Sequence, residues 1–245
     1  MLTYGMPGIS IGILAQSELN AKYNSVDSTV SYRSLYQFIP TLGTGFRLAG
    51  GLIRCGYSLQ WVNQSVGSQI VPASSSMSYT QNLSQGSGIS NHFGLALIVP
   101  IRGLPTFDFI VRNAFGTYYN TSSIVAVTSS SAGAPPIDPM TFDGAFTLHP
   151  KLGRGVIINL ILADRDITNQ SGVTFMGHID LGMELNFRDH FFLRGGWRGG
   201  YFSGGIGIKN NGAELSLGAF TQEIGTQYMG QGDTRYMFQY KVRAF

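Results

Sequence analysis

Apolar and polar residues alternate through most of the chain, and this pattern predicts β-strands. It is clearest from Val173 to Phe187, where one parity is apolar apart from a glycine and the other contains His178, Asp180 and Glu184. Because successive side chains of a strand point to opposite faces, the pattern places a continuous apolar face opposite a polar one. A strand of this length suits a tilted membrane crossing better than a typical soluble sheet.

Turn residues divide the pattern into twelve expected strands. We place these strands at residues 3–15, 30–48, 52–63, 90–102, 105–117, 141–149, 154–163, 173–187, 190–199, 201–209, 212–222 and 234–245. The second, fourth, sixth, eighth and tenth joins are short, whereas the odd joins are mostly long and rich in Ser, Thr, Gly, Gln and Asn. The long joins are expected to be flexible surface loops, at 16–29, 64–89, 118–140 and 223–233.

Short turns that alternate with long loops are typical of a bacterial outer-membrane barrel, with the short turns in the periplasm. The sequence therefore predicts one domain over residues 1–245, an all-β transmembrane antiparallel up-and-down β-barrel of about 12 strands, within a range of roughly 10 to 14. An even number of strands also predicts that both termini are periplasmic.

Composition narrows the class of protein further. Charged residues make up 12% of the chain, aromatic residues another 12%, and there are 33 glycines. The mean hydropathy of +0.08 is too low for a helical membrane protein, and no apolar run is long enough for a spanning helix. Lys and Arg occur singly, which argues against nucleic-acid binding. A soluble β-sandwich remains an alternative, and it would require Trp61, Phe109, Phe187 and Trp197 to share one interior.

Several stretches resemble the long-chain fatty-acid transporter (FadL-like) superfamily of outer-membrane barrels, especially its PorV-like and TraF-like branch. The matching segments are Phe46 to Gln64, Phe93 to Leu97, Phe107 to Gly116, His178 to Asn186, Phe192 to Trp197, Tyr201 to Lys209 and Ala213 to Gly225. The resemblance implies a transport-type or channel-type barrel. The glycine-rich N-terminal segment that forms the family's plug is not recognisable here, so a plug-dependent mechanism is not carried over.

The two ends of the sequence bear on export. Residues 1–5 lack the pattern of a secretory signal, so export requires a longer precursor than this numbering shows. The final residue, Phe245, has the aromatic character of an outer-membrane assembly signal. It lies out of phase with the apolar positions Tyr236, Phe238 and Tyr240 of the last expected strand.

The four histidines are the residues that could act as a catalytic base or as metal ligands. Nucleophilic catalysis needs a serine within reach of a base, and no histidine has the His-x-Ser spacing of the outer-membrane phospholipases. We expect no enzyme activity and no cofactor. His178, Asp180 and Glu184 could hold a metal, but an ion-pair ladder with Arg194 and Arg198 on the adjoining strand is the favoured interpretation.

The polar positions expected to face the barrel lumen are Arg47, Arg54, Asp108, Arg112, His178, Asp180, Glu184, Arg194, Arg198, Lys241 and Arg243. Their basic excess predicts a mild preference for anions in an open pore. The leading hypothesis is a channel or transporter for small or hydrophobic solutes. The alternative is a closed barrel that anchors or scaffolds a partner protein in an outer-membrane complex. The expected partners are the lipid bilayer and, in the second case, another protein.

Overall fold

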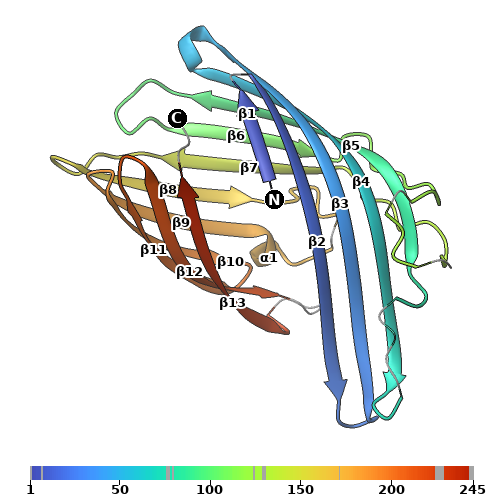
Figure 1. The fold of residues 1–245 in the computed structure, drawn as a ribbon. Helices are drawn as coiled ribbons and strands as arrows, with labels where there is room; N and C mark the ends of the chain where they lie inside the picture. The colour runs from blue at the N-terminus through green and yellow to red at the C-terminus, as the bar shows by residue number, and fades with distance from the viewer. Residues whose placement is uncertain are drawn as a thin grey trace. The chain divides into compact units, whose positions relative to one another are not determined.

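A computed structural model describes residues 2–6, 8–75, 78, 80–123, 125–128, 131–170, 172–223 and 229–242. In these residues, thirteen strands form one sheet, and each strand pairs with its neighbours in chain order (Figure 1). This confirms the predicted fold class, an all-β antiparallel up-and-down architecture of the β-barrel type. Arg243 and Phe245 lie outside the described residues.

The strands are β1 (Leu2–Met6), β2 (Ile9–Asn24), β3 (Thr29–Leu48), β4 (Ile53–Pro72), β5 (Ser84–Ile98), β6 (Thr106–Arg112), β7 (Thr141–Leu148), β8 (Val156–Asp164), β9 (Ile179–Phe187), β10 (Phe191–Arg198), β11 (Tyr201–Lys209), β12 (Ala213–Glu223) and β13 (Gly232–Val242). A 3-10 turn, η1 (Ala49–Gly51), joins β3 to β4, and a single helical turn, α1 (Phe175–His178), precedes β9. None of the helices in the described residues is long and apolar enough to cross a membrane.

The chain divides into two compact units. Unit 1 comprises Met1–Phe46, Gly56–Phe93 and Val111–Met140, and unit 2 comprises Arg47–Cys55, Gly94–Ile110 and Thr141–Phe245. Strands β3 to β6 contribute residues to both units, so the division cuts through strands and does not fall at a linker. The single domain expected for residues 1–245 stays a prediction.

The first expected strand, residues 3–15, is wrong, because it is a hairpin of two strands. β1 pairs antiparallel with β2, with Leu2 opposite Ile13 and Met6 opposite Ile9. The chain reverses at Gly8, whose φ of +85° is a conformation that glycine adopts without strain. The dipeptide Pro7–Gly8 was the turn signal in the sequence. The second half of the expected strand 3–15 is the start of β2, and the other eleven expected strands correspond to β3–β13. The described residues therefore form thirteen strands, an odd number, and the even count on which the periplasmic placement of both termini rested was wrong.

The long strands of unit 1 correct two of the expected loops. β2 runs on to Asn24, β4 runs on to Pro72 and β5 begins at Ser84, so most of 16–29 and part of 64–89 is strand. These extensions lack apolar alternation because polar side chains bond to one another across strands. Gln37 Nε2 donates to Gln64 Oε1 at 2.6 Å, and Ser65 Oγ donates to Gln85 Oε1 at 3.2 Å.

The connection from β6 to β7 was expected as a free loop at 118–140, but its backbone bonds to β5. The N–H of Asn120 donates to Ser87 O at 3.0 Å, and the N–H of Ala132 donates to Leu83 O at 2.9 Å. β6 itself ends at Arg112 and not at 117, because Asn113 has a φ of +49° and breaks the strand.

Glycine at position 86 makes this close approach possible. A Cβ atom there would lie 2.0 Å from the backbone oxygen of Asn120. Gly88 has the same role, because a Cβ would lie 2.5 Å from the backbone oxygen of Tyr118. We call residues 113–140 the docked segment.

The strands of unit 2 follow the sequence pattern closely, with one exception. The expected strand 173–187 is strand only from Ile179, because Phe175 to His178 form the helical turn α1. His178 therefore does not lie on the strand that carries Asp180 and Glu184, and its placement in the sequence analysis was wrong.

Burial in the described residues is the reverse of that in a soluble protein. Fewer hydrophobic than polar side chains are buried, and the buried hydrophobic residues are Val30, Tyr32, Ile39, Val62, Leu83, Ala114 and Phe192. The apolar parity of the strands is exposed instead, with Leu181 at 49% and Phe238 at 69%. Trp61, Phe109 and Phe187 are 48%, 50% and 38% exposed, which contradicts the shared interior of a sandwich.

Candidate functional site

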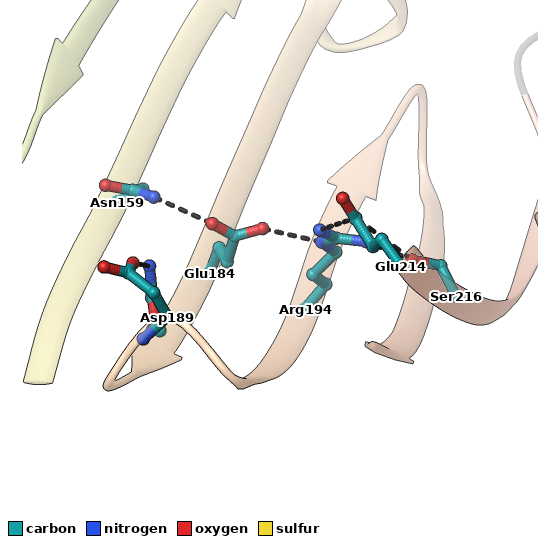
Figure 2. Close-up of polar contacts among 7 residues, drawn as sticks. Asn159, Glu184, Asp189, Arg194, Glu214 and Ser216 are labelled. Atoms are coloured by element: carbon teal, nitrogen blue, oxygen red, sulfur yellow. Dashed lines mark hydrogen bonds and ion pairs between the residues drawn. The ribbon is translucent and has the colours of Figure 1, made fainter. Parts of the chain in front are cut away.

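The polar face of unit 2 carries a continuous set of charged and amide side chains. Strand register creates it, because Glu184 on β9 lies opposite Arg194 on β10 and opposite Asn159 on β8. Farther along the same two strands, Asp180 lies opposite Arg198. Side chains of one parity share one face, and Figure 2 shows Asn159, Glu184 and Arg194 following one another across the strands. We call the set Asn159, Arg165, Asp180, Glu184, Arg194, Arg198, Glu214 and Ser216 the charge ladder.

Arg194 is the centre of the charge ladder. Its Nε donates to Glu184 Oε2 at 2.6 Å, its Nη1 donates to Ser216 Oγ at 3.1 Å, and its Nη2 lies 3.5 Å from Glu214 Oε1 (Figure 2). The guanidinium also lies 5.4 Å from the ring centroid of Phe192, within cation–π range. A planar guanidinium with several donors suits this arrangement, in which one arginine bonds to two strands at once.

Glycine on β11 lets Arg194 reach β12. The residues of β11 opposite Arg194 and Ser216 are Gly205 and Gly207 respectively. Neither has a side chain to block the path from β10 to β12. The glycine-rich sequence of β11 is therefore part of how the ladder is built.

The ladder continues from Glu184 in the other direction. Asn159 Nδ2 donates to Glu184 Oε1 at 2.8 Å, which leaves Asn159 Oδ1 facing His149 Nδ1 at 2.8 Å. A carboxylate only accepts hydrogen bonds, so it fixes the orientation of the amide. The amide oxygen in turn requires a proton on His149 Nδ1. The hydrogen bonds of this half therefore all run in one direction, toward the carboxylate of Glu184.

A second level of the ladder surrounds Asp180. Arg165 Nε forms an ion pair with Asp180 Oδ2, and Arg198 Nε lies 3.8 Å from Asp180 Oδ1. The two levels differ in charge. Around Arg194, two carboxylates share one guanidinium, whereas around Asp180 two guanidinium groups share one carboxylate. Counted over these ion pairs alone, the level around Asp180 therefore has one more positive than negative charge.

These contacts confirm the ion pairs expected between Asp180 or Glu184 and the two arginines of β10. His178 is not a member, because both of its ring nitrogens bond to backbone carbonyls of the β8–β9 connection. The alternative metal site has no support in the described residues, where no three His, Cys, Asp or Glu side chains are grouped to hold an ion. Arg165 and Ser216 were missed, since they are adjacent to the ladder in space and not in sequence. Glu214 was expected among the inward-facing acids, but its pairing with Arg194 was not predicted.

The other polar positions expected on the lumen side lie apart from the ladder. Arg47, Arg54 and Lys241 are exposed, and Asp108 and Arg112 are half-buried. Lys241 on β13 lies opposite Glu214 in the strand register.

Unit 1 contains a serine and a histidine in contact, in the order Ser-x-His and not in the expected order His-x-Ser. Ser90 and His92 on β5 are two residues apart and share a face, and Ser90 Oγ lies 3.1 Å from His92 Nε2. The serine O–H donates to Asn113 Oδ1 at 2.7 Å, and the N–H of Asn113 donates to His92 Nδ1 at 3.4 Å.

These bonds oppose nucleophilic catalysis. Because Nδ1 of His92 accepts a hydrogen bond, the proton of a neutral ring resides on Nε2 and points at the serine oxygen. A general base requires the opposite tautomer. Ser90 is also only 1% exposed. The trio joins the docked segment to β5, and the absence of enzyme activity stays a prediction.

Comparison of the chain with protein-family models, with curated proteins and with solved structures found no match. The resemblance to the fatty-acid transporter superfamily therefore stays a prediction.

Proposed function

We propose that the chain is a transmembrane β-barrel of a bacterial outer membrane. The observation that carries the proposal is the reversed burial, with large apolar side chains exposed along one face of the sheet and polar side chains buried or paired on the other. Exposed apolar patches of this extent occur where a protein meets a membrane or a partner. In a barrel, the bilayer covers the apolar face and the charge ladder lies inside.

A groove on the outward face of unit 2 supports a lipid environment. Its volume is about 500 Å³, and its lining includes Leu162, Leu181, Trp197 and Phe202. No residue that lines it carries a charge. Acyl chains are the solvent that fills such a surface at no electrostatic cost.

We test the membrane assignment by expressing the chain with a bacterial signal peptide and fractionating the cells. The expected result is recovery in the outer-membrane fraction, with extraction only by detergent. Recovery as a stable monomer in buffer without detergent would overturn the assignment.

For the function of the barrel we propose a channel or transporter for small or hydrophobic solutes, with the charge ladder as the lining that selects among them. The level around Asp180 adds positive charge on the side of the long connections, since Arg165 lies at the start of the β8–β9 connection and Arg198 at the end of β10. Excess positive charge beside a pore entrance attracts anions. The ladder thus gives a specific origin to the anion preference expected from composition.

The test is single-channel conductance in planar bilayers under a salt gradient. We expect conductance with a reversal potential that favours anions, and a shift of that potential toward cations in Arg198→Gln. Arg102→Gln, which alters an exposed arginine in the β5–β6 turn that is neither in the ladder nor among the expected lumen positions, is the matched control and leaves the potential unchanged. A correctly folded barrel that shows no conductance would overturn the channel.

The second candidate function is a closed barrel that scaffolds a partner protein. The observation that favours it is in unit 1, where the docked segment bonds to β4 and β5 through neutral polar groups, as from Asn63 Nδ2 to Val125 O at 3.1 Å and from the N–H of Asn120 to Ser87 O at 3.0 Å. This long connection is therefore ordered, and an ordered connection presents a fixed surface to another protein. Gentle detergent extraction from native membranes tests it, and migration of the chain alone would contradict a stable partner.

A further inference from the structure

The β8–β9 connection of unit 2, residues 165–178, is folded around one histidine ring. His178 is 7% exposed and is the last residue of the turn α1 (Figure 1). Its Nδ1 lies 2.7 Å from Arg165 O and 3.1 Å from Asp166 O. Its Nε2 lies 3.0 Å from Val173 O. The ring thus links the first and last parts of the connection.

The chemistry of these partners fixes the protonation of the ring. A backbone carbonyl oxygen accepts hydrogen bonds and never donates them, so each ring nitrogen that bonds to one must carry a hydrogen. Neutral imidazole has a single N–H, and only imidazolium has two. The geometry therefore requires a positively charged His178.

The charged groups around His178 come from the connection and from the strands on either side of it. They are Arg165 and Asp166 in the connection, Asp143 on β7, Asp180 on β9 and Arg198 on β10. Asp180 pairs with both arginines, whereas Asp143 Oδ1 accepts the N–H of Asp166 at 2.9 Å. Burial lowers the pKa of His178, but its hydrogen bonds to three carbonyls and the charge of Asp166 raise that pKa to a value above the usual one.

We propose that His178 is a proton-dependent clasp, which holds the β8–β9 connection closed while the ring is doubly protonated and releases residues 172–174 when the ring loses one proton. The release is one-sided, because Nδ1 has two carbonyl partners and Nε2 has one. A neutral ring keeps its hydrogen on Nδ1, and the lone pair of Nε2 then faces Val173 O and repels it.

Other bonds make the first half of the connection independent of the ring. The N–H of Asp166 bonds to β7 through Asp143, and the N–H of Ile167 donates to Phe142 O at 2.7 Å. The carboxylate of Asp166 also accepts the N–H of Gln170 at 3.1 Å. Residues 172–174 bond to the ring through the carbonyl of Val173, and their other backbone bonds are from the N–H of Gly172 to Asn169 O at 3.2 Å and from the N–H of Gly177 to Thr174 O at 2.7 Å. Loss of the proton therefore opens one end of the connection and leaves the other in place.

The direction of the pH effect follows from the raised pKa. A group whose pKa is higher in the folded protein stabilises it fully below the unfolded value, about 6.5 for histidine, and loses this contribution as the pH rises through the folded value. The clasp is thus closed in acid and opens in alkali. It acts whether or not the barrel conducts ions.

The first experiment measures ring protonation in the whole chain, refolded in detergent micelles with nitrogen-15-labelled histidine. We expect the His178 nitrogens to show two N–H groups at about pH 5.5 and a titration midpoint above the usual histidine value of about 6.5. A ring with one N–H throughout, or a midpoint at or below about 6.5, would overturn the proposal. This measurement needs no variant.

The second experiment compares hydrogen-exchange protection factors, which are corrected for the intrinsic effect of pH. Between about pH 5.5 and pH 8.5, protection of residues 172–177 is expected to fall by about tenfold, while residues 165–170 change little. In His178→Gln this pH dependence is expected to disappear, because the glutamine side chain does not gain or lose a proton in this pH range. In the control His190→Gln the pH dependence is expected to persist. The same pH dependence in both variants would contradict the clasp.

Discussion

Units 1 and 2 build strands of the same antiparallel sheet from different sequence chemistry. In unit 2, β8 to β13 alternate apolar and polar residues, because one face is exposed and apolar and the other carries the charge ladder. In unit 1, β4 and β5 continue through segments rich in Ser, Gln and Gly, because amides and hydroxyls pair on their faces. The difference shows that the alternation of apolar and polar residues depends on the environments of the two faces of a strand. A strand whose side chains have polar partners on both faces does not alternate.

The polar interactions of the two units differ in kind as well. Unit 2 uses charged groups in a directional series, whereas unit 1 uses neutral groups that bond to the main chain of the docked segment. Gln85 Nε2 donates to Thr128 O at 2.9 Å, and Gln85 Oε1 accepts the N–H of Val127 at 2.8 Å. The stability of unit 1 therefore depends mainly on the steric fit between the docked segment and β5, and the stability of unit 2 depends mainly on the balance of its charges.

The largest expected effect tests the steric fit of unit 1. Gly86→Ala places a Cβ 2.0 Å from the backbone oxygen of Asn120, and neither backbone can move without breaking hydrogen bonds. We expect the free energy of unfolding to fall by about 3 kcal/mol, as for severe overpacking. Urea unfolding in detergent measures the loss, and faster proteolysis within residues 113–140 shows that the docked segment has detached.

The same strand offers a matched control for this substitution. A Cβ at Gly94 of β5 meets no atom within 4 Å. Gly94→Ala is therefore expected to raise the free energy of unfolding by about 0.5 kcal/mol, because alanine gives the unfolded chain less backbone freedom than glycine does. Equal effects of the two alanines would show that position 86 is not sterically limited.

The next effect tests the charge balance of unit 2. Arg194→Met keeps most of the side-chain volume but leaves the carboxylates of Glu184 and Glu214 without their shared cation. Removal of one partner from a buried pair costs several kcal/mol. The Arg194 side chain is 36% exposed, and water therefore screens part of the charge, so we expect a loss of about 2 kcal/mol. Urea unfolding gives the value.

Two comparisons sharpen this result. Glu184→Gln in the Arg194→Met background is expected to cost less than Glu184→Gln alone, by about 1 kcal/mol, because the two residues interact. Arg54→Met, which alters an exposed arginine bonded to Gly51 O at 3.4 Å, is expected to change stability by less than about 0.5 kcal/mol. Additive effects at positions 184 and 194 would contradict the ladder.

The contrast between the charged face of unit 2 and the neutral polar faces of unit 1 also explains which residues could be predicted from the sequence. Asp180, Glu184, Arg194 and Arg198 were predicted to pair because two adjoining strands and a short turn between them fix the register. The pairings of Arg165 and Glu214 were not predictable, because Arg165 belongs to a long connection and Arg194 reaches Glu214 only across the glycines of β11.

The missed residues in unit 1 have a different physical cause. β4 beyond Asn63 has no apolar parity, and the partners of Gln85 lie in a segment more than forty residues away in the sequence, as its bond to Thr128 shows. Only the turn signals were visible there. His178 was misplaced because three backbone carbonyls hold its ring, and a pattern of side chains does not show backbone partners.

A smaller effect distinguishes a structural from a catalytic role of Ser90 in unit 1. Ser90→Ala leaves Asn113 Oδ1 and His92 Nε2 without their partner, and we expect a loss of about 1.5 kcal/mol in the free energy of unfolding. The wild-type chain is expected to hydrolyse nitrophenyl esters and phospholipids no faster than this variant. Ester hydrolysis that disappears in Ser90→Ala would show a catalytic serine.

The smallest expected effect tests whether the strands of unit 1 lack apolar alternation only because their polar side chains pair with one another. Gln64 on β4 is 6% exposed, and Gln37 Nε2 donates to its Oε1 at 2.6 Å. Gln37→Leu alone leaves a buried amide unpaired and is expected to cost about 1 kcal/mol. The double variant Gln37→Leu/Gln64→Leu removes both amides and restores apolar contact, so its cost is expected to be below about 0.5 kcal/mol. Urea unfolding of the three chains gives the comparison. If the double variant loses more stability than Gln37→Leu, the hydrogen bond between the two side-chain amides itself stabilises the extended part of β4. The strands of unit 1 then depend on their polar residues as much as unit 2 depends on its charges.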